Sequence, residues 1–314
     1  MTDNRGFLEG IIDDGRPLLS LTAVALLLSG VFAIFLSIRR EFLPHDVNYL
    51  GMTADQLCRL ADCRIVRFMF HDRVAFGGTL LAIAALYLWL VAFPLREGAR
   101  WAWWAFALSG LLGVGSFFAY LGYGYLDSWH GAATLALIPV FALGLWKSWS
   151  TATRPSIPWL LSPDARSGPA VLRAGRWALV GTGVGMIAAG LSILVIGTKW
   201  VFVPQDLVFM GLSRVDLAAI NPHLIPLIAH DRAGFGGGLA SAGLLVTVCA
   251  WYARPERAFN EVVLLAGLLG FGCAIGVHYF EGYTDVTHLG PALVGGLLFV
   301  SSLILQMPHR LVSA

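Results

Sequence analysis

Eight stretches of about 20 mostly apolar residues recur along this 314-residue chain, and they limit its fold more than any other feature. They are centred on residues 18–38, 75–95, 101–121, 131–146, 177–196, 234–251, 262–280 and 290–305. A stretch of this length crosses the hydrocarbon core of a bilayer as a helix, which bonds its own backbone polar groups. Only 13% of the residues are charged, against roughly a quarter in soluble domains. We therefore predict an all-α integral membrane protein with eight transmembrane helices in a lipid bilayer.

Charge and cysteine content exclude several other classes of protein. The formal net charge is only +2 and no basic run occurs, so the chain lacks the electrostatic footprint of a nucleic-acid-binding protein. Four cysteines in 314 residues are too few for a disulfide-stabilised secreted scaffold.

An internal repeat divides the chain into two related halves. The motif HDRVAFGG at residues 71–78 recurs as HDRAGFGG at residues 230–237, with six identities in eight positions. FLPHD at 42–46 recurs as FVPQD at 202–206, and GYLDSWH at 124–130 recurs as GYTDVTH at 282–288. The nearly constant offset indicates a duplicated four-helix unit.

The duplication predicts two tandem four-helix bundles, residues 1–150 and 173–314, joined by a linker at residues 151–172. Because each unit has an even number of spans, both copies have the same orientation, and a pseudo-two-fold axis runs along the membrane normal. Each copy has a long loop after its first span that contains a helix-start signal, Thr53 with Gln56 and Ser213 with Asp216. These signals predict short helices that either cap the connection or cover a site beneath it.

The lysine and arginine residues favour one orientation in the membrane. Twelve of the 21 lie at the termini and in the even-numbered loops, which the positive-inside rule assigns to the cytoplasm. We expect cytoplasmic termini, a bacterial-type inner or plasma membrane, and histidine clusters toward the extracytoplasmic face.

Histidines recur at matching places in the two copies. His71, near the start of the second span, matches His230, and His130, at the start of the fourth span, matches His288. The second and fourth spans start on the same side, so we expect His71 to face His130 and His230 to face His288. Two imidazoles on facing helices can hold a haem iron axially. The histidines without a repeat partner, which we expect to be structural, are His45, His223, His278 and His309.

The residues around these histidines suit a bound macrocycle. The positions on the same helix face are small, namely Ala75, Gly78 and Ala82 after His71, and Gly234, Gly237 and Ser241 after His230. Such a strip leaves room for haem b, or else it permits close helix packing. Arg73 and Arg232 could pair with haem propionates. Asp72 and Asp231 point about 100° away from the histidines on a helix and are expected to bind arginine or backbone.

A non-haem metal site is an alternative. Asp127 and His130 are three residues apart, as are Asp285 and His288, so each pair is expected to share a helix face. A histidine of the second or sixth span would complete a 2-His-1-carboxylate set, which suits non-haem iron or another transition metal. Otherwise each aspartate fixes the tautomer of a ligating histidine.

Two cysteines lie in the first long loop. Cys58 and Cys63 are spaced C-x4-C, and the second copy lacks them. We predict that they form a disulfide or a redox pair.

The layout resembles the heme A synthase family, whose members have two pseudo-symmetric four-helix bundles with histidines on helices 2, 4, 6 and 8. The matching positions are His71, His130, His230 and His288, together with Cys58 and Cys63 in the loop where that family has a cysteine pair. The resemblance implies one or two b-type haems held by two histidine pairs. That family carries a glutamate three residues before its second-helix histidine, where this chain has Phe68 and Leu227. The resemblance therefore implies a haem-binding or electron-transfer relative rather than an enzyme that hydroxylates a haem methyl group.

The sequence thus favours a haem-binding membrane protein of redox type, as an electron-transfer protein or an oxidoreductase, acting with a membrane redox partner or within a larger complex. Three alternatives stay open: a non-haem metal membrane enzyme, a non-catalytic subunit of a respiratory or photosynthetic complex, and a polytopic transporter. A transporter would place its polar residues near the bilayer midplane, whereas the histidines here cluster at one face.

Overall fold

The computed structural model describes residues 12–119, 125, 128–155 and 157–306, and the regular structure in this part of the chain is helical. The long helices are α2 (Arg16–Arg39), α5 (Arg64–Leu90, continued by the π-helix η1, Val91–Leu95), α6 (Arg100–Ala119), α7 (Ser128–Trp149), α9 (Ala170–Lys199), α12 (Leu224–Tyr252), α13 (Arg257–Glu281) and α14 (Val286–Gln306). All of these except α6 are long and apolar enough to cross a membrane, which gives seven candidate spans. The prediction of an all-helical membrane protein is confirmed at this level.

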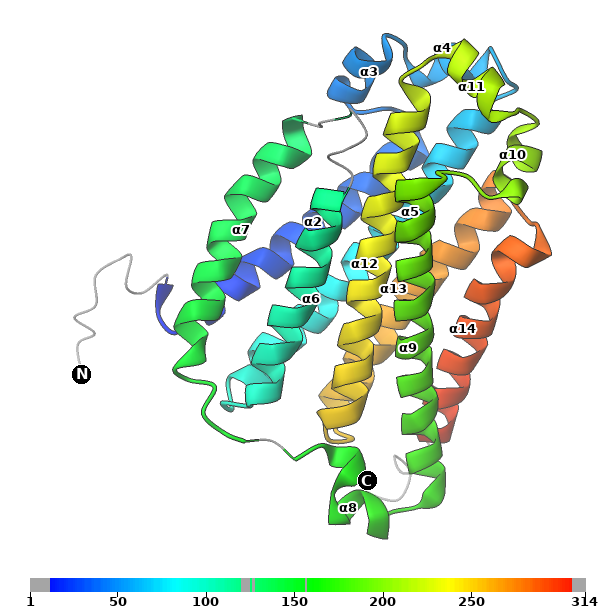
Figure 1. Ribbon diagram of the computed structural model, residues 1–314. Coiled ribbons are helices and arrows are strands. Elements are labelled where there is room, and N and C mark those ends of the chain that lie inside the picture. The colour runs from blue at the N-terminus through cyan, green and yellow to red at the C-terminus, as the bar shows by residue number, and fades with distance from the viewer. Residues whose placement is uncertain (1–11, 120–124, 126–127, 156, 307–314) are drawn as a thin grey trace.

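Shorter helices lie at the two ends of the bundle (Figure 1). One end carries α3 (Pro44–Leu50), α4 (Ala54–Cys58), α10 (Pro204–Met210) and α11 (Arg214–Ile220). The linker at the other end contains the 3-10 helix η3 (Trp159–Leu161) and α8 (Pro163–Ser167). We call the four short helices α3, α4, α10 and α11 the cap.

Helices α5 and α12 form the centre of the bundle. Most of α5 is buried, whereas most residues of α2, α9, α13 and α14 are partly or fully exposed, as expected of helices in contact with lipid. Helix α5 packs against α2, α13 and α12, and α12 packs against α9, α6 and α5. A helix that is apolar on all sides is stable only where other helices surround it, which explains the central position of this pair.

The two copies exchange helices. In the described part of the chain, α6 from the first copy packs most extensively on α12 of the second, and α13 from the second copy packs most extensively on α5 of the first. These contacts do not separate the helices into the two predicted bundles. The physical reason is that α5 and α12 each need helices packed on every side. For each of them the third long helix of the other copy, α13 for α5 and α6 for α12, covers one side.

Close helix crossings repeat in both copies because glycines lie at the contact. A Cβ on Gly30 of α2 would lie 2.7 Å from the carbonyl oxygen of Gly77 on α5, and one on Gly190 of α9 would lie 2.6 Å from that of Gly236 on α12. Small residues of this kind let helix backbones approach in a membrane. The same glycine contact therefore joins the first two long helices of each copy.

The cap connects the copies above the bundle. The predicted helix starts are present: Thr53 and Gln56 form a reciprocal capping box before α4, and Ser213 and Asp216 form one before α11. Asn221 Nδ2 donates a hydrogen bond of 2.7 Å to the carbonyl oxygen of Leu50 in the other copy. Cys58 and Cys63 form a disulfide between the end of α4 and the start of α5. This disulfide was one of the two forms that their spacing predicts.

A leucine in place of Gly190 should destabilise the protein strongly. The new side chain would overlap the backbone of α12, and overpacking of this kind costs about 1–3 kcal/mol or more. Gly272→Leu is the matched control, because a Cβ there meets nothing within 4 Å. Thermal unfolding in detergent should show a clearly lower midpoint for the first variant only. Equal midpoints would contradict the crossing described here.

Candidate metal centre

Two arginines, Arg232 buried and Arg73 partly buried, form ion pairs between the copies. Arg73 Nε on α5 lies 2.8 Å from Asp231 Oδ2 on α12, and Arg232 Nε on α12 lies 3.1 Å from Asp72 Oδ2 on α5. Each helix therefore supplies one acid and one base to its repeat partner. A charge at this depth is costly unless it is paired, so the two contacts fix how α5 and α12 face each other.

Aspartates of the cap complete the same arrangement from above. Arg73 also lies 2.9 Å from Asp46 of α3, and Tyr125 Oη donates a hydrogen bond of 2.6 Å to that carboxylate. Burial disfavours the charged form of Asp46, but the Arg73 guanidinium and the Tyr125 hydroxyl together hold its pKa below the ordinary value.

The second copy repeats these cap contacts. Asp206 of α10 accepts hydrogen bonds from Arg232 at 2.6 Å and from Tyr283 Oη at 2.7 Å. Burial, followed by the charge of Asp206, raises the pKa of the Tyr283 phenol well above its ordinary value. We call the two arginines, their four aspartates and the two tyrosines the ion-pair network.

The network changes the roles expected for its members. Asp72 and Asp231 bind arginine, as predicted. Arg73 and Arg232, which we expected to pair with haem propionates, are each held by two aspartates of the protein instead. The sequence did not reveal these partners because they come from another copy or from the cap.

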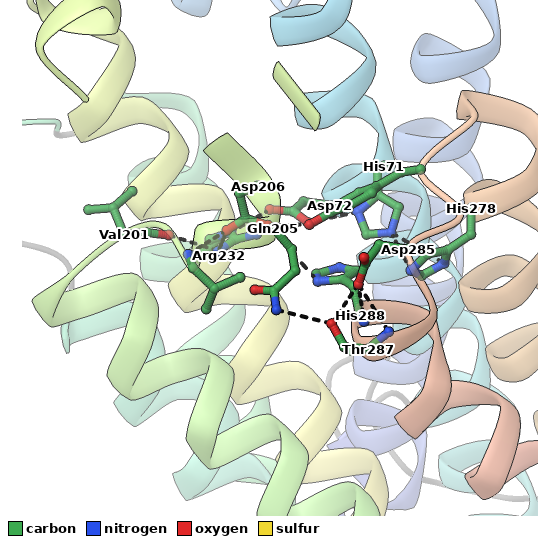
Figure 2. A network of polar contacts seen from close by, with 12 residues as sticks. His71, Asp72, Val201, Gln205, Asp206, Arg232, His278, Asp285, Thr287 and His288 are labelled. Carbon is green, nitrogen blue, oxygen red and sulfur yellow. Dashed lines mark hydrogen bonds and ion pairs between the residues drawn. The ribbon is translucent and has the colours of Figure 1, made fainter. Parts of the chain in front are cut away.

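Three histidines gather beside the network, at the head of the bundle (Figure 2). His71 of α5, His278 of α13 and His288 of α14 each offer a ring nitrogen, and these nitrogens all lie within 4.8 Å of one another. His71 and His278 are buried and His288 is partly buried. We call these three residues the histidine triad.

Hydrogen bonds determine which nitrogens of the triad carry protons. Asp72 is paired with Arg232, so its side chain is a carboxylate, which can only accept hydrogen bonds. His71 Nδ1 lies 3.0 Å from Asp72 Oδ1 and must therefore donate a proton to this contact. His278 Nδ1 donates to the carbonyl oxygen of Ala274 at 2.6 Å, and this contact is shorter than its 3.3 Å separation from His71 Nε2. In neutral rings both Nε2 atoms then present lone pairs.

The two rings meet edge to face, at 87°, and His71 Nε2 lies at similar distances from both nitrogens of the His278 ring. The Nε2 atoms of His71 and His278 lie 3.1 Å apart. With metal–nitrogen bonds of about 2.0–2.1 Å, two imidazole nitrogens in adjacent coordination positions lie roughly 2.9–3.4 Å apart. The separation of the two Nε2 atoms thus suits two ligands of one cation, and such a cation would require the His278 ring to turn until its Nε2 lone pair points at the ion.

His288 completes the triad from α14. Its ring centroid lies 5.5 Å from that of His71 and 5.4 Å from that of His278. Its backbone N–H donates to Asp285 Oδ1 at 3.0 Å, and the Thr287 hydroxyl donates to the same oxygen at 2.6 Å. These bonds, that of Thr287 first, lower the pKa of Asp285.

Asp285 is not a ligand in this arrangement. It precedes the first residue of α14 and accepts hydrogen bonds from the start of that helix. The prediction that it shares a helix face with His288 is therefore wrong. Its repeat counterpart Asp127 lies outside the described residues.

The histidines pair differently from the prediction. His288 lies beside His71 of the other copy, and not with His230, which packs against Tyr125 at 5.0 Å between ring centroids. The exchange of helices between copies causes this difference. The side chain of His130, the predicted partner of His71, lies outside the described part of the chain.

His278 is the member of the triad that sequence analysis missed. We expected it to be structural because it lacks a repeat partner; the repeat offset of 158 residues aligns it with Tyr120. The available signal was its position near the end of the preceding span, four residues before the GYTDVTH motif. A comparison of the residues in which the two copies differ, rather than of those that they share, would have identified His278.

A cavity of about 860 Å³ extends from the triad into the bundle, between α5, α9, α12, α13 and α14. Ala75 and Ala82 of the predicted small-residue strip line it. Gly78 instead packs on Cys273, and Gly237 packs on Ser116 of α6. Both predicted uses of small residues, space and close packing, therefore occur.

No family model, no curated protein and no solved structure matches this chain.

Removal of one arginine of the network should destabilise the fold. Arg232→Met leaves Asp72 and Asp206 buried without their cation, at a cost of about 3–5 kcal/mol. Arg257→Met is the control, since that side chain is 89% exposed and pairs only with Glu261; an exposed pair is worth at most about 1 kcal/mol. Chemical unfolding in detergent measures both. Equal losses would contradict the role assigned to the network.

The network also predicts a pH dependence of stability. The pKa of Asp46 is lower in the folded state than its ordinary value, so unfolding at acidic pH takes up a proton. The stabilising contribution is complete above the ordinary carboxyl pKa of about 4 and is lost as the pH falls through the lowered folded value. Thermal unfolding between pH 6 and pH 3 should therefore show a smaller acid loss in Asp46→Asn. An unchanged acid profile would count against this assignment.

Proposed function

We propose that the protein is a membrane metalloprotein of redox type, in which the histidine triad binds one transition-metal ion at the head of the cavity. The observation that carries the proposal is the convergence of His71, His278 and His288, each of which offers a ring nitrogen within 4.8 Å of the other two. Imidazole ligands suit iron, copper, zinc and nickel.

The surrounding residues support this role. Asp72 accepts from His71 Nδ1 and is itself held by Arg232, so the imidazole is oriented through two contacts. The carbonyl oxygen of Ala274 holds His278 in the same way. Partners of this kind fix the tautomer of ligating histidines and raise their basicity.

Three protein ligands leave coordination positions free, and all three histidines line the cavity. A bound transition-metal ion would supply electron transfer or activation of a small ligand there. His71 and His278 are buried, and burial increases the strength of electrostatic interactions at the site.

Haem b is the second candidate, and the volume and small lining residues of the cavity favour it, together with the resemblance to the heme A synthase family. His71 or His288 would then be an axial ligand. His71 and His278 do not fit opposite faces of one haem, because nitrogens in opposite positions lie about 4 Å apart, whereas theirs are 3.1 Å apart. The triad therefore fits a non-haem ion better than a bis-histidine haem.

The proposal includes the membrane arrangement. Helix α6 would be the eighth span, each copy contributing four, with the termini cytoplasmic and the triad toward the extracytoplasmic face. A membrane redox partner or a larger complex would meet the protein there.

Metal analysis of the purified protein tests the proposal. We expect about one transition-metal ion per chain, and at least a tenfold lower content in His71→Ala, His278→Ala and His288→Ala. His223→Ala is the control, because that residue precedes α12 and its ring contacts the backbone of Tyr49 in the cap. An absorption spectrum of the same samples distinguishes the candidates.

A colourless or weakly coloured protein with one ion per chain supports the non-haem site. A Soret band at one haem per chain, lost in His71→Ala or His288→Ala, supports haem instead. Wild-type protein without metal or haem after reconstitution with either would overturn both.

A further inference from the structure

We infer that the cavity below the triad binds a membrane-dissolved lipid with a quinol-type head group and a long apolar chain. This inference rests on the proposed function, because it names the substrate class of the same site. Three features of the cavity carry it: the distribution of polar groups, the position of the mouth and the charge at the head.

The polar groups of the cavity gather at one end. The triad, Gln205 and Thr287 line the head, and Gln205 Nε2 donates to Thr287 Oγ1 at 3.0 Å (Figure 2). The rest of the lining is mostly apolar, as Leu86, Val246 and Phe299 illustrate. Its few hydroxyl groups, on Thr79, Thr182 and Ser192, donate to backbone carbonyl oxygens of their own helices. Such a cavity complements a molecule with one polar end, and its volume of about 860 Å³ lies within the usual range for ligand sites, about 300–1,000 Å³.

The mouth of the cavity faces the bilayer. Every exposed residue of the lining lies on α9 or α14, whereas the lining residues of α5, α12 and α13 are buried or partly buried. Examples are Gly185 and Ser192 on α9 and Val294 on α14, the last 66% exposed. The two helices touch near the linker, where a Cβ on Gly175 would meet Gln306, and they separate toward the triad (Figure 1).

The neighbouring surface is also apolar. Val184 and Val195 on α9 and Leu297 and Val300 on α14 are exposed, as expected of helices in contact with lipid. A ligand that enters between α9 and α14 therefore comes from the hydrocarbon phase, which selects for lipophilic molecules.

The protein offers no unpaired arginine or lysine to a phosphate at the head. Arg232 is the one arginine in the lining, which has no lysine, and Asp72 and Asp206 neutralise it. An anionic head would also approach the Asp72 carboxylate. A metal ion held by the triad would take a phenolic oxygen as ligand, and without the ion the unprotonated ring nitrogens would accept hydrogen bonds from hydroxyl groups. A quinol has both properties on a flat ring.

Binding of a decyl-substituted benzoquinol to the purified protein tests the inference. Gly185→Trp and Ala292→Trp place bulk on the α9 and α14 walls of the cavity. Gly276→Trp is the control, because Gly276 is exposed on α13, lies outside the lining and has open space around it. We expect at least tenfold weaker binding in both cavity variants, wild-type affinity in the control, and unchanged metal content in all three.

The outcomes separate this inference from the metal proposal. Full metal content with equal quinol binding in all variants, or no quinol binding to the wild type, overturns the inference alone. Tight quinol binding that the cavity variants weaken, in protein without metal, supports the inference and overturns the metal site. Phospholipid, rather than the quinol, found in the cavity by lipid extraction and competition also overturns the inference.

Discussion

The reciprocal ion pairs between α5 and α12 are the contacts on which the rest of the structure depends. Each helix carries an aspartate next to an arginine, and adjacent side chains on a helix point about 100° apart and cannot neutralise each other well. Arg73 with Asp231 and Arg232 with Asp72 solve this by pairing across the two copies. Burial of these charges is tolerable only in that register, so the ion pairs bring α5 and α12 together in the centre.

The candidate metal centre follows from this pairing through Asp72. One of its oxygens accepts from Arg232 and the other accepts from His71, so the contact that joins the copies also orients an imidazole. The second copy then supplies His278 and His288 on helices that pack around α5 and α9. His230, the repeat counterpart of His71, packs against Tyr125. The two copies have therefore diverged, and the described triad forms around His71.

Much of the fold could be predicted from the sequence, because hydrophobic length and motif repetition are local properties. The long helices, the duplication, the capping boxes at Thr53 and Ser213, and the involvement of His71 and His288 follow from such patterns. The exchange of α6 and α13 could not be predicted, since apolar faces do not specify which copy covers them. His278 was missed for a related reason. Comparison of the two copies draws attention to residues that both share, whereas this site uses a histidine that only the second copy has.

The most direct test of the central claim is X-ray absorption spectroscopy at the metal edge of the purified protein, after metal analysis has identified the ion. The account predicts imidazole scattering from three nitrogen ligands at about 2.0–2.1 Å, reduced to two in His278→Ala. A porphyrin signature, or a spectrum that His278→Ala leaves unchanged, would contradict the three-histidine centre.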